Sequence, residues 1–108
     1  MRFSARINPE VKAMNKIFGN TLKKHVDKLK MYVPVVDRVH GKHHPEFHTV
    51  RQLTESILDK SSQPGADLSD EFAKLRETTN NYTVPDDVCE TFEAVYKMLA
   101  ELDRAYHE

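Results

Sequence analysis

The sequence predicts an all-α protein, a bundle of four helices formed by one domain over residues 1–108. The length of 108 residues suits a single domain with a modest core. The chain holds 3 glycines, fewer than a turn-rich β-sandwich needs. Apolar residues recur in steps of three and four along two long segments, which is the spacing of one helix face. These observations favour packed helices joined by short connections.

The first helix should begin at Asn8, a good N-cap, with Pro9 at the first helical position. Pro34 removes a backbone donor inside this segment, so we expect the helix to kink or to split there. Gly41 should end the helix in a left-handed conformation. The regular apolar stripe comprises Leu22, Val26, Leu29, Val33 and Val36, followed by His40, and Val11, Met14 and Phe18 extend it less regularly.

A second helix should start at Pro45 and Glu46, because His44 precedes a proline and is biased towards extended backbone. Its apolar positions are Phe47, Val50, Leu53 or Thr54, and Ile57. Residues 60–65 have the composition of a loop. Asp67 or Ser69 should cap a short third helix, which contains Leu68, Phe72 and Leu75 and ends at residues 78–81, where asparagine tolerates left-handed backbone.

The fourth helix should begin at Pro85, with Asp86 and Asp87 in its first turn. Its stripe is Val88, Phe92, Val95, Leu99, Leu102 and Tyr106. We expect the first and fourth helices to exceed about twenty residues and the other two to have about four turns or fewer. Short helices cannot cover long stripes, so we predict an exposed apolar face that a second copy completes. The alternative is that Pro34 folds the first helix back and closes the core internally.

Composition excludes several classes of function. The net charge of −1, from 16 basic and 17 acidic residues, gives no basic excess for nucleic-acid binding. A single cysteine excludes an internal disulfide and fits a reducing compartment. No apolar run approaches the ~20 residues of a membrane span, and no secretory signal is visible. We therefore expect a cytoplasmic protein without membrane or nucleic-acid partners, and a solvated basic face at Lys23, Lys24, Lys28 and Lys30.

Histidines are the main candidates for chemistry. Four of the 6 histidines lie between residues 40 and 48. His40 and His44 have the spacing of a helical metal-ligand pair, but Gly41 and Pro45 interrupt the helix around them. One hypothesis is a metal site at His40 and His44. In a dimer, two chains would also bring together His43, His48 and His107, with Glu46 or Glu108 as the carboxylate.

The alternative gives these histidines ordinary structural roles. His40 lies near a helix C-terminus, where a cation is favoured, and His43 and His44 are then loop residues. His40 also ends the apolar stripe, so it should point inward as either a ligand or a hydrogen-bonded core residue. The spacing favours the second role. Cys89 is expected to be a small apolar filler, because the acidic side chains around it oppose a reactive thiolate.

Two segments resemble a known family. These are the motif at residues 38–46, Arg-Val-His-Gly-Lys-His-His-Pro-Glu, and the segment 75–85, which is followed by Cys89 and residues 96–102. Together they resemble the hemerythrin-like iron–sulfur cluster repair proteins, over most of residues 18–108. The resemblance implies a hemerythrin-like four-helix bundle with shortened second and third helices. It also implies a di-iron cofactor and a role in repairing clusters damaged by oxidative or nitric oxide stress.

The ligand set that the resemblance implies is incomplete in this sequence. His40 matches a family ligand, whereas the earlier ligand histidine of the first helix falls at Gly19. The ligand pair of the second helix is missing, the third-helix histidine falls near Gly65, and the last pair would begin beyond Glu108. His107 matches a position two residues before that pair. We therefore expect no resident cofactor, although the family holds two irons.

The sequence therefore predicts binding rather than catalysis. The leading hypothesis is a non-catalytic helical module, related to the repair proteins, that acts through a homo-oligomeric interface or a protein partner. The alternative is a metal-binding hemerythrin-like protein that takes part in iron–sulfur cluster repair.

Overall fold

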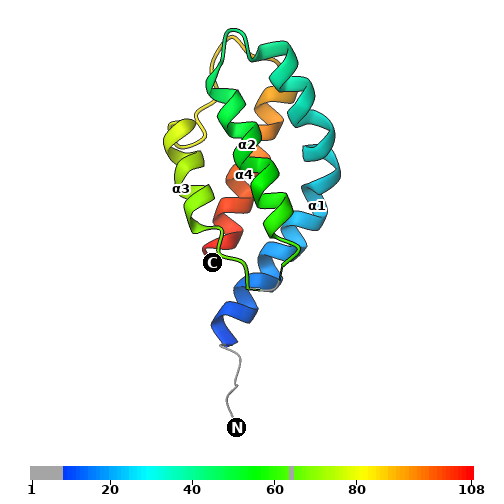
Figure 1. Ribbon diagram of the computed structural model, residues 1–108, viewed down its shortest axis with the longest axis vertical. Coiled ribbons are helices and arrows are strands. Elements are labelled where there is room, and N and C mark those ends of the chain that lie inside the picture. Colours follow the sequence, from blue (N-terminus) through cyan, green and yellow to red (C-terminus); the bar gives the residue numbers. More distant parts are fainter. Residues whose placement is uncertain (1–8, 64) are drawn as a thin grey trace.

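Four α-helices form an elongated bundle (Figure 1). The computed structural model describes the backbone of residues 9–63 and 65–108 and the side chains of residues 16–63 and 65–108. The helices are α1 (Pro9–His40), α2 (Glu46–Lys60), α3 (Ser69–Thr78) and α4 (Glu90–Tyr106). They alternate in direction, and α1 lies against both α2 and α4. The described residues contain no strand, so the predicted all-α bundle is confirmed.

Side chains from all four helices share one apolar core. The predicted stripe of α1 supplies Leu29, Val33 and Val36, and that of α4 supplies Phe92, Val95, Leu99 and Leu102, all of them buried. Phe47, Phe92 and Tyr96 pack together near the end of the bundle where α1 ends, with 4.8 Å between the centroids of the tilted Phe92 and Tyr96 rings. Each fully buried side chain of this size stabilises the fold by about 1.5–3 kcal/mol. The inward faces predicted from the sequence are therefore correct.

α1 neither splits nor folds back at Pro34. The helix continues for 32 residues, and Figure 1 shows it bowed along its length. Pro34 has no N–H to donate to the carbonyl of Lys30, so one helical hydrogen bond is missing there. The predicted start at Pro9 is confirmed, whereas Asn8 and the side chains of Val11 and Met14 lie outside the described residues.

Gly41 ends α1, but its backbone is not left-handed as predicted. Its amide instead donates to the carbonyl of Asp37 at 2.9 Å. A Cβ at this position would collide with the Asp37 carbonyl oxygen and would lie 2.7 Å from the His48 Cε1 atom. Glycine is therefore needed because the Asp37 carbonyl, in the last turn of α1, leaves no room for a side chain.

α2 begins at Glu46, as predicted, and buries Thr54 rather than Leu53. The Thr54 hydroxyl donates to the carbonyl of Val50 at 2.8 Å, so its polar atom is satisfied inside the core. Asp67, one of the two predicted caps of α3, accepts hydrogen bonds from the backbone N–H (3.0 Å) and the hydroxyl (2.6 Å) of Ser69. These bonds satisfy a donor at the start of the short α3 helix.

The connection after α3 contains three consecutive residues with left-handed backbone. Asn80, Asn81 and Tyr82 have φ values of 53°, 58° and 61°. Left-handed asparagines are expected at this position, but a bulky tyrosine with positive φ is uncommon and strained. The Tyr82 amide is held by the Thr79 hydroxyl oxygen at 2.8 Å.

α4 begins at Glu90, five residues after the predicted start at Pro85. Cys89, the N-cap residue, has extended backbone with ψ of 173°, so helical geometry cannot extend upstream through it. Val88 therefore lies outside the helix, although it packs against the core. With 17 residues, α4 is also shorter than predicted and is close in length to α2, which has 15.

The exposed apolar face differs from the predicted one. The stripe expected to remain uncovered is largely buried, and a second row on α1 is exposed instead, at Ile17, Met31, Val35 and Val39. Among the described residues, no helix combines the length and the apolar character that crossing a membrane requires.

Candidate functional site

Among the described residues, the polar features that could support chemistry are four histidine-containing clusters, around Cys89, His44, Asp37 and Glu101, and the network around the buried Asp103 carboxylate. Two of the clusters lie where α1 ends, beside the connection that leads into α4 (Figure 1). The loop after Gly41 brings His44 close to this connection, and the last turn of α1 brings His40. Residues distant in sequence therefore meet at one end of the bundle.

His40 pairs with Cys89. The Nε2 atom of His40 lies 3.2 Å from the Cys89 Sγ atom, and its ring packs edge-on against Phe92. His40 makes the hydrogen bond that was predicted, but it is half-buried at the edge of the core rather than inside it. Cys89 is exposed, so its prediction as an apolar filler is wrong. The extended backbone before α4 turns the thiol outward and towards His40.

His44 bridges two carboxylates. Its Nδ1 atom lies 3.0 Å from Glu46 Oε2, and its Nε2 atom lies 2.9 Å from Asp87 Oδ1. Desolvation lowers the pKa of His44, but the hydrogen bonds to Glu46 and Asp87 outweigh it, so the net pKa is raised. The hydrogen bond from His44 is also the main reason that the pKa of Asp87 is lowered. Both contacts need an N–H, so they favour a doubly protonated imidazolium that ties two connections together.

Asp37 is the centre of a third cluster, on the outer side of the same end of the bundle. Arg51 Nη1 lies 3.1 Å from Asp37 Oδ2, and Arg51 Nε lies 3.0 Å from Glu55. His48 Nδ1 lies 2.5 Å from Asp37 Oδ1, but the atoms are not aligned as a hydrogen bond, so that oxygen has no hydrogen-bond partner. This cluster joins the last turn of α1 to α2.

Asp103 organises the opposite part of the molecule. Its buried carboxylate accepts two hydrogen bonds from Arg76, at 2.7 and 2.8 Å, and one from the Tyr82 hydroxyl at 2.8 Å. His107 Nδ1 lies 2.9 Å from the same carboxylate. Burial, followed by the hydrogen bond to Asp103, raises the pKa of Tyr82 well above its usual range. The network holds the strained Tyr82 against α4.

His25 also contacts a carboxylate, that of Glu101. Its Nε2 atom lies 2.8 Å from Glu101 Oε1, and Lys24 contacts the other oxygen of the same carboxylate at 3.1 Å. The hydrogen bond from His25, followed by that from Lys24, lowers the pKa of Glu101. Five histidines therefore contact a carboxylate or a thiol of the protein itself; they are His25, His40, His44, His48 and His107.

These contacts do not fit a di-iron centre. Among the described residues, no three histidine, cysteine or acidic side chains converge as a group that could hold a metal ion. In His44, both ring nitrogens are engaged by carboxylates on opposite sides of the ring, so neither lone pair is available to a metal in this arrangement. The hypothesis of a site at His40 and His44 therefore gains no support within one chain. Its form with two chains, which adds His43, His48 and His107, stays a prediction.

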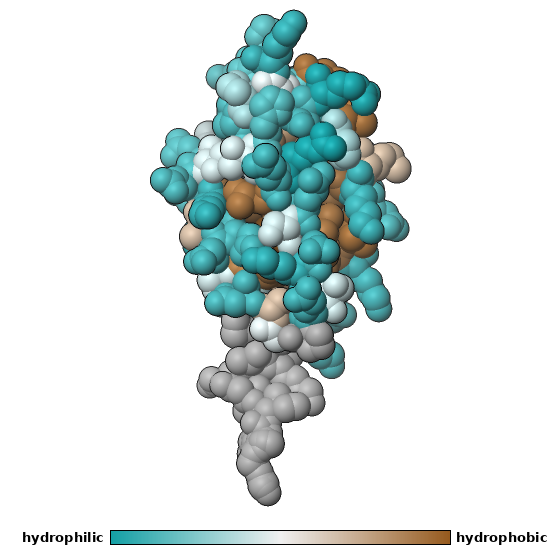
Figure 2. Space-filling model, in the orientation of Figure 1, coloured by the Kyte–Doolittle hydropathy of each residue, from teal (hydrophilic) through white to brown (hydrophobic). Residues whose placement is uncertain are grey.

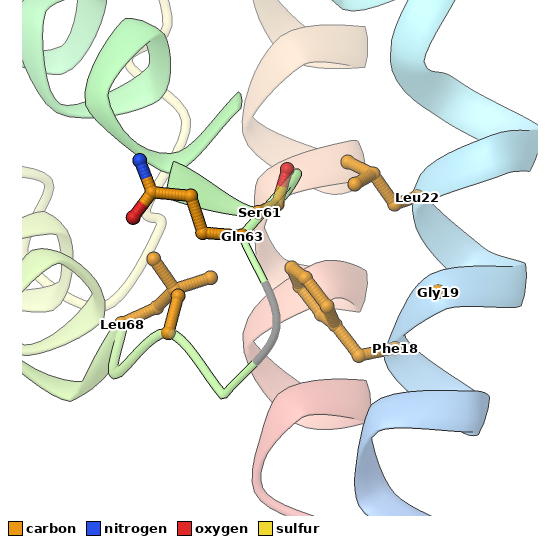
Figure 3. Close-up of a pocket in the computed structure, with 7 residues that line it drawn as sticks. Phe18, Gly19, Leu22, Ser61, Gln63 and Leu68 are labelled. Carbon is orange, nitrogen blue, oxygen red and sulfur yellow. The ribbon is translucent and has the colours of Figure 1, made fainter. Parts of the chain in front are cut away.

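The family-matched positions on α1 are also too far apart. Gly19 and His40 lie on one continuous helix, and their 21-residue separation corresponds to about 31 Å, whereas the two metals of a binuclear centre lie about 4 Å apart. Gly19 instead borders a small hollow of about 90 Å³ at the other end of the bundle. Figure 3 shows this hollow between Phe18 and Leu22 of α1 and the segment that contains Ser61, Gln63 and Leu68.

Sequence reasoning missed the two best-satisfied networks, those around Asp103 and Glu101. One signal was available for the first of them. Asp103 lies four residues after Leu99 on α4, at the edge of its apolar face, where a carboxylate is buried only if it is paired. The resemblance had already identified the segment that contains Arg76 and Tyr82, but spacing alone could not connect it to Asp103.

Comparison with known proteins gives one partial relative. No family model matches the chain, and no solved structure matches it. The iron–sulfur cluster repair protein ScdA of Staphylococcus haemolyticus (strain JCSC1435) is 36% identical over 56 residues. The aligned segment covers 52% of this chain and 23% of that protein. The chain is thus similar to part of an iron–sulfur cluster repair protein.

Proposed function

We propose that this protein is a non-catalytic helical module that takes part in iron–sulfur cluster repair through association with another protein. The partial likeness to a repair protein supports the link to cluster repair. One structural observation supports the non-catalytic role: five of the histidines contact acidic or thiol groups of the chain itself, and no three metal-ligating groups converge in the described part. No step of the proposed function uses a bound metal.

A structural role for the histidines follows from their partners. His44 ties the α1–α2 loop to the segment before α4, and His25 ties α1 to α4. Charge-assisted hydrogen bonds of this kind position connections and restrict how the helices move. In a metalloprotein such histidines would bind the metal. In this proposal they instead fix the positions of α1 and of the α1–α2 loop relative to α4 and the segment before it.

Recovery of a damaged iron–sulfur enzyme tests the proposal. The enzyme is inactivated by peroxide, and its recovery is followed with a repair protein of the ScdA type, with and without this chain. We expect the chain to change the recovery rate only when the repair protein is present. An equal mass of an unrelated protein is the control. An unchanged rate would contradict the proposed role in repair.

Metal analysis separates this proposal from the alternative of a metal-binding protein. The chain is incubated anaerobically with ferrous iron, dialysed, and analysed for iron, zinc and copper. We expect far less than one metal ion per chain. Two irons per chain with the spectrum of a bridged pair would establish the alternative and overturn the proposed function.

A further inference from the structure

The outer face of α1 is an apolar surface that the fold itself does not use. Among the described residues, the four exposed large apolar side chains all belong to α1: Ile17, Met31, Val35 and Val39, which are 41, 65, 38 and 58% exposed. At 100° per residue, all four point within about 40° of one direction. Lys24 and Lys28 start at nearly the same angle around the helix axis, although the Lys24 ammonium turns to Glu101 of α4. We call this set of six residues the outer face of α1.

The outer face is distinct from the packed stripe. Val35 is 38% exposed, whereas its neighbours in the stripe, Val33 and Val36, are 2 and 1% exposed. In Figure 2, apolar surface is visible along the side of the molecule where α1 lies, between hydrophilic residues. Met31, Val35 and Val39 follow one another on the helix, and contiguous exposed apolar residues rimmed by charge are typical of an interaction site.

A basic hollow adjoins one end of the outer face. It has a volume of about 530 Å³ and is open to solvent. Val39 belongs to both the hollow and the outer face. Arg38, Lys42 and Arg51 supply three cations to the hollow, and its other lining side chains are His43, His48 and Asp37.

The charges in the hollow favour an anionic group. The single carboxylate, Asp37, already contacts Arg51 and His48. Arg38 and Lys42 line the hollow with no carboxylate partner among the described residues. An aspartate or glutamate from a partner would therefore meet two cations that gain a counterion by binding it.

Charge complementarity also argues against a second copy as the occupant. In a two-fold antiparallel pair centred on Val35, Lys42 of one chain would face Lys28 of the other. That arrangement sets basic side chains against each other beside the apolar row. The same face is poorly suited to a lipid surface, because interfacial helices anchor through bulky leucine, phenylalanine or tryptophan side chains, and this row holds valine, isoleucine and methionine.

We propose that the outer face of α1 and the adjoining hollow bind an acidic amphipathic helix of a partner protein. The partner's apolar residues pack on Met31, Val35 and Val39, and an acidic side chain enters the hollow beside Arg38 and Lys42. The contact row from Met31 to Val39 is about 12 Å long, which matches two to three turns of a helix. This inference rests on the proposed function, for which it supplies the docking surface.

Two synthetic helical peptides of about sixteen residues test the proposal. Both carry the same row of leucines, flanked by glutamates in one and by lysines in the other. Fluorescence anisotropy measures their binding to the full chain at low and high salt. We expect the glutamate peptide to bind at least about tenfold more tightly, and salt to weaken its binding. Equal affinity for both peptides would overturn the proposal.

Variants locate the binding surface. Val35→Asp and Arg38→Glu should each weaken binding of the glutamate peptide by about tenfold or more. Met31→Glu, at the most exposed position of the row, is a second variant if Val35→Asp disturbs folding. Lys74→Glu makes the same charge change as Arg38→Glu on the exposed side of α3 and should leave affinity unchanged.

Two further outcomes would also overturn the proposal. The first is tighter binding to vesicles of phosphatidylglycerol than to the glutamate peptide. The second is self-association, measured by sedimentation, that Val35→Asp abolishes, because a second copy would then be the occupant. The peptide assay contains no iron–sulfur enzyme, so its result is independent of the repair assay. Peptide binding without any effect on repair would overturn the proposed function alone.

Discussion

The inner and outer faces of α1 both carry apolar residues, but only those of the inner face are covered by the other helices. Leu29, Val33 and Val36 are covered by the other helices of the same chain. Val35 and Val39 are similar in size and chemistry but face solvent beside lysine and arginine side chains. Hydrophobicity alone therefore does not tell which apolar residues build the fold. On this helix, burial against the other helices distinguishes the core face from the outer face.

Adjacent substitutions on α1 give the largest expected difference. Val36→Asp would bury an unpaired carboxylate and should destabilise the chain by about 4 kcal/mol or more, enough to unfold it. Val35→Asp places the same group in solvent and should change the free energy of unfolding by about 0.5 kcal/mol or less. Urea denaturation followed by circular dichroism measures both. Equal losses would show that Val35 belongs to the core.

On α4 a buried and a more exposed carboxylate, Asp103 and Glu101, can be compared in the same way. Asp103→Ala removes the acceptor shared by Arg76, Tyr82 and His107 and should destabilise the fold by about 2–4 kcal/mol. Glu101→Ala breaks more exposed pairs with Lys24 and His25 and should cost less than about 1 kcal/mol. The midpoints of urea denaturation measure which of the two variants loses more stability. A larger loss for Glu101→Ala would contradict the assignment of Asp103 as the central carboxylate.

Gly19 lies within α1 and Gly41 follows its last residue. Replacing each with alanine should change the free energy of unfolding in opposite directions. Gly41→Ala forces a methyl group against Asp37 and His48 and should cost about 1–3 kcal/mol. Gly19→Ala meets no atom within 4 Å and should stabilise the helix by up to about 1 kcal/mol. Thermal unfolding of both variants measures the difference. A neutral Gly41→Ala variant would show that the last turn of α1 can make room for a methyl group.

The smallest expected effect is a pH dependence at His44. Because folding raises the pKa of His44, its contribution to stability is complete below its ordinary value of about 6.5 and is lost as the pH rises through the raised value. The lowered pKa of Asp87 means that the same tie is also lost in strong acid. The difference in unfolding free energy between wild type and His44→Gln should therefore be largest below about pH 6.5 and shrink as the pH rises above that value.

His43→Gln is the control for this titration, because His43 is an exposed neighbour in the same loop. Its unfolding free energy should follow that of the wild type across the same range. If the His44→Gln difference stays constant with pH, the two carboxylate contacts do not hold the loop in solution.

Periodicity predicted the inner faces of the helices because core packing repeats with the turn of the helix. Most buried apolar members of α1 and α2 were identified in this way, and so were Phe92, Val95, Leu99 and Leu102 of α4, whereas Tyr96 and Met98 were missed. Periodicity failed at the start of α4, where the extended backbone of Cys89 and the contact between His44 and Asp87 depend on tertiary structure. It also missed the outer face of α1, because a second apolar row beside a regular stripe resembles a broader version of the same face.

The candidate site was harder to predict than the fold. The sequence identified His40 and His44 as chemically interesting, and both meet partners across the bundle. Their partners Cys89 and Asp87 lie more than forty residues away, in a segment that was expected to be helical. The similarity to a repair protein added the biological context that neither spacing nor charge could supply.

The central claim is that this chain acts through the outer face of α1. The most direct test is the recovery rate of the damaged iron–sulfur enzyme, measured with the repair protein and either wild-type, Gly19→Ala or Val35→Asp chain. The account predicts that wild type and Gly19→Ala change the rate equally and that Val35→Asp, although folded, has no effect. A Val35→Asp chain as effective as the wild type would contradict it.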